Sequence, residues 1–447
     1  MCRAGWSQGF GCAGLFALWV LSPIPSHAYQ QPDLQGRWEF NSIASGPGAP
    51  WWERAQMSVA PNGSFTALTS DQAGGSGNVL GTFALSSAGI VTIAGAGVFR
   101  AALDQGTSVL AGTDTWSGFG AGTTELRVGL KMSPYYSASD LAGAWELNII
   151  ASGPGAPWWQ RGRITVAANG SFTGTFIDHA GQSDPAAGSL ALSSAGVVTF
   201  SGSAVARGAL DVGKTVFAMT NTWTGFAAGT AELSVGVKMA ASYTLADLAG
   251  TWDVNGFATG PGAPWWTRSH ITIAADGSYT SANTESNGTI TNTSGTLSIT
   301  SAGVITRSGS TSSRGVLDAD KTVMVWTNLW TAGAPGTTQL EIATKTGGVT
   351  LDAPGGSSTA LALASVRPNP VARGPLVVSF VLADDSPATL ELFDVNGRCI
   401  ERRDVGALGA GSHELALGAS ERLQAGVYLM RLRQGERSRV QRVVVLD

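Results

Sequence analysis

The chain has 447 residues and a net charge of −4, with only 13% charged residues and 60 glycines. A chain of this length exceeds one ordinary hydrophobic core and predicts about three or four domains. Low charge combined with abundant Gly, Ser and Thr favours β-strands and tight turns over helical bundles. The sequence contains no basic run that could neutralise phosphates, which argues against nucleic acid as a partner.

The N-terminus has the pattern of a cleaved signal peptide. Arg3 precedes an apolar stretch from Ala13 to Leu21, and Pro23 and Pro25 follow it. Small residues stand at the −3 and −1 positions of a cut after Ala28, so we predict a signal peptide over 1–28. No later segment approaches the roughly 20 apolar residues of a transmembrane helix. We therefore expect a secreted protein without a transmembrane segment.

The three cysteines give no intramolecular cross-link. Cys2 and Cys12 lie in the predicted signal peptide, which leaves Cys399 alone. Each domain must then be held by its core and not by disulfides. We interpret Cys399 as a small buried side chain in preference to a site of intermolecular pairing.

A unit of 107 residues (140 − 33 and 247 − 140) recurs three times without an insertion, opening at Asp33, Asp140 and Asp247. The predicted repeat units are 33–139, 140–246 and 247–345. The same offset relates Trp38, Trp145 and Trp252, and also Trp116, Trp223 and Trp330. Such fidelity indicates duplication of a complete folding unit.

Turn signals divide each unit into short strands. Asn62-Gly63 has the composition of a tight hairpin turn, and similar dipeptides recur in the other copies. The pattern predicts an all-β unit of eight antiparallel strands. In unit one we expect them near 37–44, 51–60, 63–70, 79–87, 90–97, 98–104, 107–117 and 124–132.

The pattern of the last strand favours a closed barrel. Apolar and polar residues alternate there, as expected for a sheet with one wet face. Closure would place the acid of the first strand beside the lysine of the last, and we predict exposed pairs within each copy: Glu39 with Lys131, Glu146 with Lys238, and Asp253 with Lys345. The seventh strand is apolar on both faces in copies two and three, which favours a sandwich or propeller blades as alternatives to the barrel.

Each unit opens with Gly-x-Trp, as in Gly36-Arg37-Trp38. This opening resembles that of the lipocalin and avidin (calycin) β-barrels. The resemblance implies a small-molecule binder with its site inside the barrel.

The segment Gly46-Pro47-Gly48-Ala49-Pro50-Trp51-Trp52 recurs in all copies and is followed two residues later by an arginine. Its prolines predict a stiff connection between the first two strands that presents two indoles at one end of the unit. Paired indoles with a nearby guanidinium can bind sugars or other flat ligands, whereas the simpler interpretation is a buried cap with the arginine packed over it. The candidate ligand-binding residues are Trp51, Trp52, Arg54, Trp158, Trp159, Arg161, Trp265, Trp266 and Arg268.

Catalytic and metal-binding patterns are missing from the sequence. No His-x-x-x-His, Cys-x-x-Cys or Gly-x-Ser-x-Gly spacing occurs. The recurring acids, such as Asp104, lie where hairpin turns use them, and we expect the recurring Arg100, Arg207 and Arg314 to clamp the same turns. The sequence predicts no enzyme activity, no catalytic residue, no metal and no cofactor.

Composition changes after the third unit. Residues 346–360 are rich in Gly, Ser and Thr and predict a flexible linker, and residues 361–447 contain no Trp and no Lys. Short strands separated by turns there predict an immunoglobulin-like β-sandwich.

The segment 361–447 carries Pro368-Asn369-Pro370, a Phe393-Asp394-Val395-Asn396-Gly397-Arg398 hairpin and Ala425-Gly426-Val427-Tyr428. It resembles the type A C-terminal sorting domain of type IX secretion substrates and the immunoglobulin-like domain of flagellar hook-capping proteins. The resemblance implies recognition by a secretion machinery and delivery to the outer surface of a Gram-negative-type bacterium. Its Arg442 and terminal Asp447 depart from the lysine-containing tail of that family.

The sequence as a whole favours a secreted or cell-surface binding protein in which three equivalent units give avidity for glycans or small molecules. A structural stalk without a ligand and an enzyme with one active copy are the alternatives.

Overall fold

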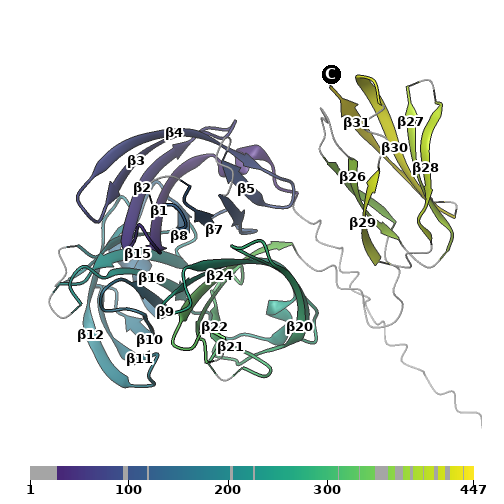
Figure 1. Cartoon of the computed structure of the whole chain (residues 1–447). Coiled ribbons are helices and arrows are strands. Elements are labelled where there is room, and N and C mark those ends of the chain that lie inside the picture. The colour runs from purple at the N-terminus through teal and green to yellow at the C-terminus, as the bar shows by residue number, and fades with distance from the viewer. Residues whose placement is uncertain are drawn as a thin grey trace, which may run out of the picture. The chain divides into compact units, whose positions relative to one another are not determined.

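The computed structural model describes residues 28–93, 99–117, 120–201, 205–224, 227–310, 312–331, 333–347, 361–367, 376–382, 386–395, 397–406, 411–417, 423–435 and 437–446. The predicted signal peptide up to residue 27 and the predicted linker from residue 348 lie outside these residues. The chain divides into two compact units, one up to Thr350 and one from Leu351. In Figure 1 the first unit is coloured from purple to green and the second from yellow-green to yellow.

The first unit contains three closed antiparallel barrels of eight strands each. The first barrel consists of β1 (Gly36–Ser45), β2 (Trp51–Val59), β3 (Ser64–Asp71), β4 (Ser76–Leu85), β5 (Ile90–Ile93), β6 (Arg100–Leu103), β7 (Val109–Thr115) and β8 (Thr124–Lys131). The second consists of β9 (Gly143–Ser152), β10 (Trp158–Val166), β11 (Ser171–Asp178), β12 (Ser183–Leu192), β13 (Val197–Phe200), β14 (Arg207–Leu210), β15 (Val216–Thr222) and β16 (Ala231–Lys238). The third consists of β17 (Gly250–Thr259), β18 (Trp265–Ile273), β19 (Ser278–Glu285), β20 (Ile290–Ile299), β21 (Val304–Arg307), β22 (Arg314–Leu317), β23 (Val323–Leu329) and β24 (Thr338–Gly347).

The closed barrel is confirmed because β1 pairs with both β2 and β8. A 3-10 helix precedes the first strand of each barrel: η1 (Gln31–Leu34), η2 (Ala138–Leu141) and η3 (Leu245–Leu248). The Trp38 indole donates from Nε1 to the carbonyl of Leu34 at 2.8 Å, and Lys131 Nζ donates to the carbonyl of Asp33. The lysine lies over the Trp38 ring, 5.8 Å from its centre. The predicted pairing of Glu39 with Lys131 is therefore wrong, because the lysine closes the end of its own barrel.

The interior of each barrel is filled with side chains. In the first barrel, Phe65 and Phe83 pack with their ring centres 4.7 Å apart, and Trp38, Phe40 and Phe99 belong to the same core. Trp145 with Phe217, and Trp252 with Trp326, fill the corresponding space in the other two. The interior ligand site implied by the calycin resemblance is occupied by this packing.

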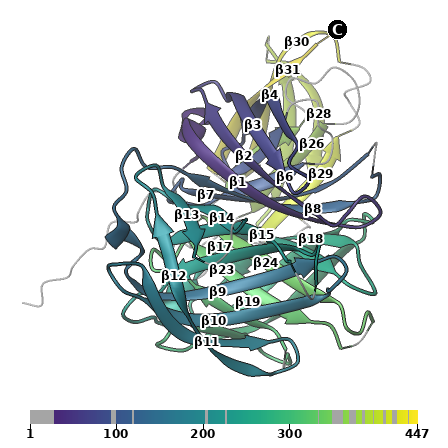
Figure 2. The ribbon, with the colours of Figure 1, turned by 90° about the vertical axis from the view of Figure 1, so that its left-hand side faces the viewer.

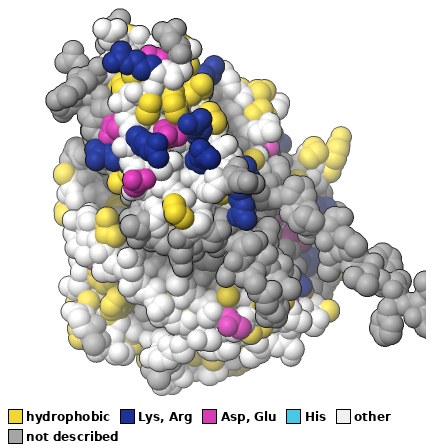
Figure 3. Space-filling view, turned by 90° about the vertical axis from the view of Figure 1, so that its right-hand side faces the viewer, with side chains coloured by type: hydrophobic (Ala, Val, Ile, Leu, Met, Phe, Trp, Pro, Cys, Tyr) yellow, Lys and Arg dark blue, Asp and Glu magenta, His cyan; other side chains and the backbone are white. Residues whose placement is uncertain are grey.

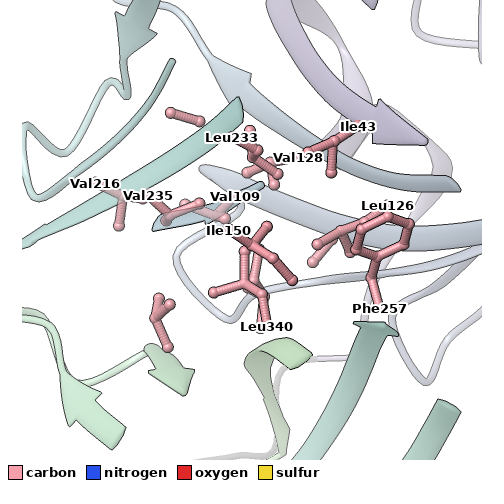
Figure 4. Packing of buried hydrophobic residues seen from close by; sticks show 14 of the residues in the cluster. Ile43, Val109, Leu126, Val128, Ile150, Val216, Leu233, Val235, Phe257 and Leu340 are labelled. Atoms are coloured by element: carbon pink, nitrogen blue, oxygen red, sulfur yellow. The ribbon is translucent and has the colours of Figure 1, made fainter. Parts of the chain in front are cut away.

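The alternation in the last strand was predicted correctly. The prediction that its polar face points outward to solvent, with the apolar face inside the barrel, was wrong. Gly129 pairs with Phe40 and points inward, where a Cβ would lie 2.5 Å from the Phe40 ring. Leu126, Val128 and Leu130 point outward and are fully buried. They belong to a core shared by all three barrels, in which residues such as Ile43, Leu233 and Phe257 meet (Figure 4).

This shared core explains the doubly apolar seventh strand. In β15, Phe217 fills the barrel interior while Val216 and Ala218 face the shared core. Figure 2 shows strands of the three barrels stacked against one another. Each buried Val, Leu or Ile contributes roughly 1.5–3 kcal/mol, so the barrels are held together by a core comparable to their own.

The second unit contains two sheets. One has the order β25 (Ala362–Arg367), β26 (Leu376–Leu382), β29 (Gly411–Leu417), and the other has the order β28 (Cys399–Asp404), β27 (Ala388–Asp394), β30 (Gly426–Gln434), β31 (Arg437–Val445). Leu376 and Phe380 from the first sheet share a core with Leu392 and Met430 from the second.

Cys399 is exposed, so its predicted burial is wrong. It begins β28, an edge strand that is exposed along most of its length. On the face drawn in Figure 3, charged side chains gather in one region.

Candidate functional site

The second tryptophan of each Trp-Trp pair is buried between barrels, where the arginine two residues later is buried in the first copy and partly buried in the other two. Trp52 is 5% exposed and donates from Nε1 to Thr222 Oγ1 of the second barrel at 2.6 Å. The Arg54 guanidinium lies 4.0 Å above the Trp52 ring and donates to Thr220 Oγ1 and its carbonyl. Burial lowers the pKa of Arg54 to about 10.

The equivalent contacts join the barrels in a closed ring. We call the three interfaces seam one (first and second barrels), seam two (second and third) and seam three (third and first). In seam two, Arg161 donates to the carbonyl of Ser312. In seam three, Trp266 donates to Thr115 Oγ1 at 2.7 Å and Arg268 donates to Thr113 Oγ1. The third barrel therefore packs back on the first, as in a cyclic trimer.

Each seam also contains a buried acid bonded to an arginine of the next barrel. Glu39 pairs with Arg207 at 2.7 Å, and Asp253 pairs with Arg100 at 2.8 Å. In seam two, Glu146 pairs with Arg314 and with Arg163 of its own barrel. The acids predicted to be exposed are thus buried, and the arginines predicted to clamp turns instead join barrels.

Seam two has a defect that the sequence explains. Trp159 Nε1 is buried and has no acceptor among the described residues. The position equivalent to Thr115 and Thr222 is Leu329, which has no hydroxyl.

We predict that Leu329→Thr stabilises the barrel unit by about 1 kcal/mol, because an unsatisfied buried donor costs about 1–3 kcal/mol and the lost methyl contacts offset part of the gain. Thr222→Leu in seam one is the matched reverse change and should destabilise by a similar amount. Denaturant midpoints of the two variants and the parent test this. Equal destabilisation by both substitutions would contradict it.

The first tryptophan of each pair packs at the rim of its own barrel against the tryptophan that follows the seventh strand. Trp51 is half-buried and packs edge-on against Trp116, with ring centres 5.2 Å apart. Trp158 with Trp223 and Trp265 with Trp330 repeat this arrangement at 5.6 Å. In the first barrel the pair lines a groove of about 550 Å³, together with Gly48, Pro50, Glu53, Asp71, Gln72, Ala73, Gly120 and Thr123.

A polar floor lies behind each tryptophan pair and differs between copies. Trp116 donates to Glu125, which is paired with Arg127 at 2.6 Å. Trp223 donates to Glu232, and burial raises the pKa of that carboxyl. Trp330 donates to the neutral Gln339 at 2.9 Å. The tryptophan pair is thus the same in all three barrels, whereas the residue that accepts its hydrogen bond differs in charge.

Trp116, Trp223 and Trp330 were recognised in the sequence as recurring residues but not as members of a site. They follow the seventh strand, far along the chain from the Trp-Trp loops. Closure of the barrel brings the two segments together. Recurrence of an indole immediately after a strand was the available signal.

The recurring turn acids have a structural role. Asp104 Oδ1 accepts backbone N–H groups of Ser108 and Val109 at 2.7 Å, and Asp211 and Asp318 repeat this clamp. Burial raises the pKa of Asp211 and Asp318 to about 7, although these backbone bonds favour the charged form. Within the described ranges, no group of three or more His, Cys, Asp or Glu side chains could hold a metal ion.

Fold and site together define an all-β head of three barrels joined to a separate C-terminal domain. Residues 365–446 match the family model described as the secretion system C-terminal sorting domain, which confirms the resemblance found in the sequence. The chain is therefore a secreted or cell-surface protein. Among the described residues, no helix has the length and apolar character needed to cross a membrane.

Three solved structures are similar to parts of the chain. Transferrin binding protein B from Haemophilus parasuis is 10% identical, with a TM-score of 0.23 over 70% of this chain and 75% of that one. Transferrin binding protein B from serogroup B Neisseria meningitidis is 8% identical, with a TM-score of 0.23 over 69% and 75%. A protein of unknown function from the DUF3598 family of Nostoc punctiforme is 10% identical, with a TM-score of 0.18 over 47% and 99%. No curated protein matches the chain.

Proposed function

We propose that the three-barrel unit is a non-enzymatic binding unit that holds ring-shaped ligands beside its tryptophan pairs. Glycans are the ligand class that we propose first. One observation carries this proposal. The same edge-on tryptophan pair recurs in all three barrels, and Trp116 and Trp223 remain 36% and 37% exposed. Closing the end of a barrel does not require so much exposed indole, whereas an aromatic wall beside polar groups suits a sugar ring.

The candidate residues from the sequence have two roles in the proposed binding. Trp51, Trp158 and Trp265 would contact the ligand with their partner indoles. The second tryptophan and the arginine of each loop would support the grooves from within the seams, since Thr222, the acceptor of Trp52, directly precedes Trp223.

Titration of the full chain with soluble cello-, chito- and manno-hexaose, followed by tryptophan fluorescence, tests the proposal. We expect a saturable change that is weakened at least about tenfold in Trp116→Ala/Trp223→Ala/Trp330→Ala, since a lost aromatic contact of about 1.4 kcal/mol is a factor of ten. Tyr135→Ala, which removes an aromatic residue that is 82% exposed outside the grooves, should bind as the parent does.

A response that survives in the triple variant, or no response to any hexasaccharide, contradicts the proposal. The second outcome would favour a structural role for the unit. Unfolding midpoints of the variants separate loss of binding from loss of the fold.

A further inference from the structure

The three β1–β2-type loops meet at one end of the ring. A depression of about 200 Å³ there is lined by residues of all three copies: Ser45, Gly46, Ala49, Pro50, Ser152, Gly153, Ala156, Pro157, Thr259 and Gly260. A Cβ on Gly153 would lie 2.7 Å from Pro50 Cγ, and one on Gly260 would lie 2.8 Å from Pro157 Cγ. Each loop is therefore packed against the next, and the three loops share one end of the unit.

The groove of the first barrel begins at this depression. Pro50 lines both the depression and the groove, and Trp51 follows it directly. Trp158 and Trp265 occupy the same position after the other two loops and pack on their partner indoles, so the end of the unit where the loops meet also carries the three tryptophan pairs. We call this surface the groove face.

The first groove is tied to the second barrel. Gln72, which lines the first groove, donates from Nε2 to the carbonyl of Gly229 at 2.9 Å. Gly229 lies in the loop between β15 and β16, and the adjacent Thr230 bonds the second barrel's own proline-rich loop through Gly155. The buried Trp52 also holds Thr222, the residue before Trp223. The seams therefore fix the first groove relative to the second barrel, and the Trp266–Thr115 bond, next to Trp116, fixes it relative to the third.

The charge of the first groove selects between ligand classes. Its lining includes the acids Glu53 and Asp71, and none of the residues described as lining it is Lys or Arg. The nearby Arg127 is engaged by Glu125 and Glu53. An anionic ligand would meet unfavourable charge here, whereas neutral hydroxyls could bond to the carboxylates.

We infer that the groove face binds the surface of a neutral, insoluble polysaccharide, with its three grooves engaged together. This inference rests on the proposed function and adds the physical form and charge of the ligand. A rigid array of weak sites gains affinity only where the ligand repeats within its reach, because the second and third contacts are then intramolecular. A particle surface supplies such repeats, and a single soluble hexasaccharide does not.

The experiment compares retention of the full chain on cellulose, chitin and mannan particles with binding of the matching soluble hexasaccharides. Three proteins are used: the parent, Trp223→Ala/Trp330→Ala with one intact groove, and the triple variant with none. Alginate beads serve as an anionic polysaccharide control, and Tyr135→Ala as the aromatic control.

We expect the affinity for at least one neutral particle to fall about 10²-fold from three grooves to one, a size typical of avidity. Over the same change, soluble binding should lose sites without losing affinity per site. Particle affinity that falls only threefold, or equal retention on alginate, overturns the inference while soluble binding still supports the proposed function. Absence of both soluble and particle binding overturns both proposals.

Discussion

The second barrel with its 3-10 helix, produced alone as residues 133–239, is expected to assemble into a cyclic trimer. Its Leu233 and Val235 are fully buried in the shared core and would face water in a single barrel. The repeat also carries both halves of a seam: Glu146 can pair with Arg207, and Trp159 can donate to Thr222, of neighbouring copies. An interface of this head-to-tail kind closes at three in the full chain and has the same geometry available in a homotrimer.

Light scattering of the purified fragment measures its mass in solution. At micromolar concentration we expect three times the mass of one fragment. Leu233→Asp places an unpaired charge in the shared core and should abolish the trimer. Thr175→Asp, on the exposed outer face of β11, is the matched control and should leave the trimer intact. A stable, soluble monomer of the unmodified repeat would contradict the prediction.

The strand pattern was predictable because short-range signals determine it. Hairpin turns such as Asn62-Gly63 divide the unit, and the expected strand 124–132 agrees with the observed Thr124–Lys131. The number of strands and their alternation favoured closure into a barrel, with the sandwich and propeller blades as alternatives. The sorting domain could be recognised because its motifs lie close together in the chain.

The seams could not be predicted in the same way. Alternation in β8 shows that one face is apolar, but not whether that face is inside the barrel or between barrels. The small Gly129 opposite Phe40 was the available signal that the other face points inward. Likewise, an acid recurs at the position of Glu39 and an arginine at the position of Arg207 in every copy. The repeat alone does not reveal whether an acid meets the arginine of its own copy or of the next.

The groove was half predictable. Composition singled out the Trp-Trp loops, and the prolines placed them at one end of each barrel. The separation of the two indoles into a seam and a groove depends on strand alternation at the start of β2, where Trp51 pairs with Ala44 and Trp52 pairs with Ile43. Because Ile43 faces the shared core, Trp52 is buried between barrels and Trp51 remains at the rim.

Glu146→Gln is expected to destabilise the barrel unit by about 3 kcal/mol. The carboxylate side chain is 2% exposed and bonds Arg314 of the third barrel and Arg163 of its own. Arg161 lies in the same seam, where burial and Arg314 lower its pKa to about 10 and Glu146 opposes that shift. Removing the acid leaves the Arg314 and Arg163 guanidinium groups without their shared partner and Arg161 without a nearby negative charge. Breaking a buried pair costs about 3–5 kcal/mol.

The lower end of that range applies because the side chains of Arg314 and Arg163 keep 29% and 42% of their exposure and can reach water. Denaturant unfolding of the full chain gives the cost, with the exposed Asp184→Asn of the same barrel as the control, expected to change stability by less than about 0.5 kcal/mol. Glu146→Gln/Arg314→Met should recover part of the loss, because the second substitution removes one of the unpaired charges and keeps its apolar stem. Equal stability of the Glu146→Gln and Asp184→Asn variants would show that the seam is held by its apolar core alone.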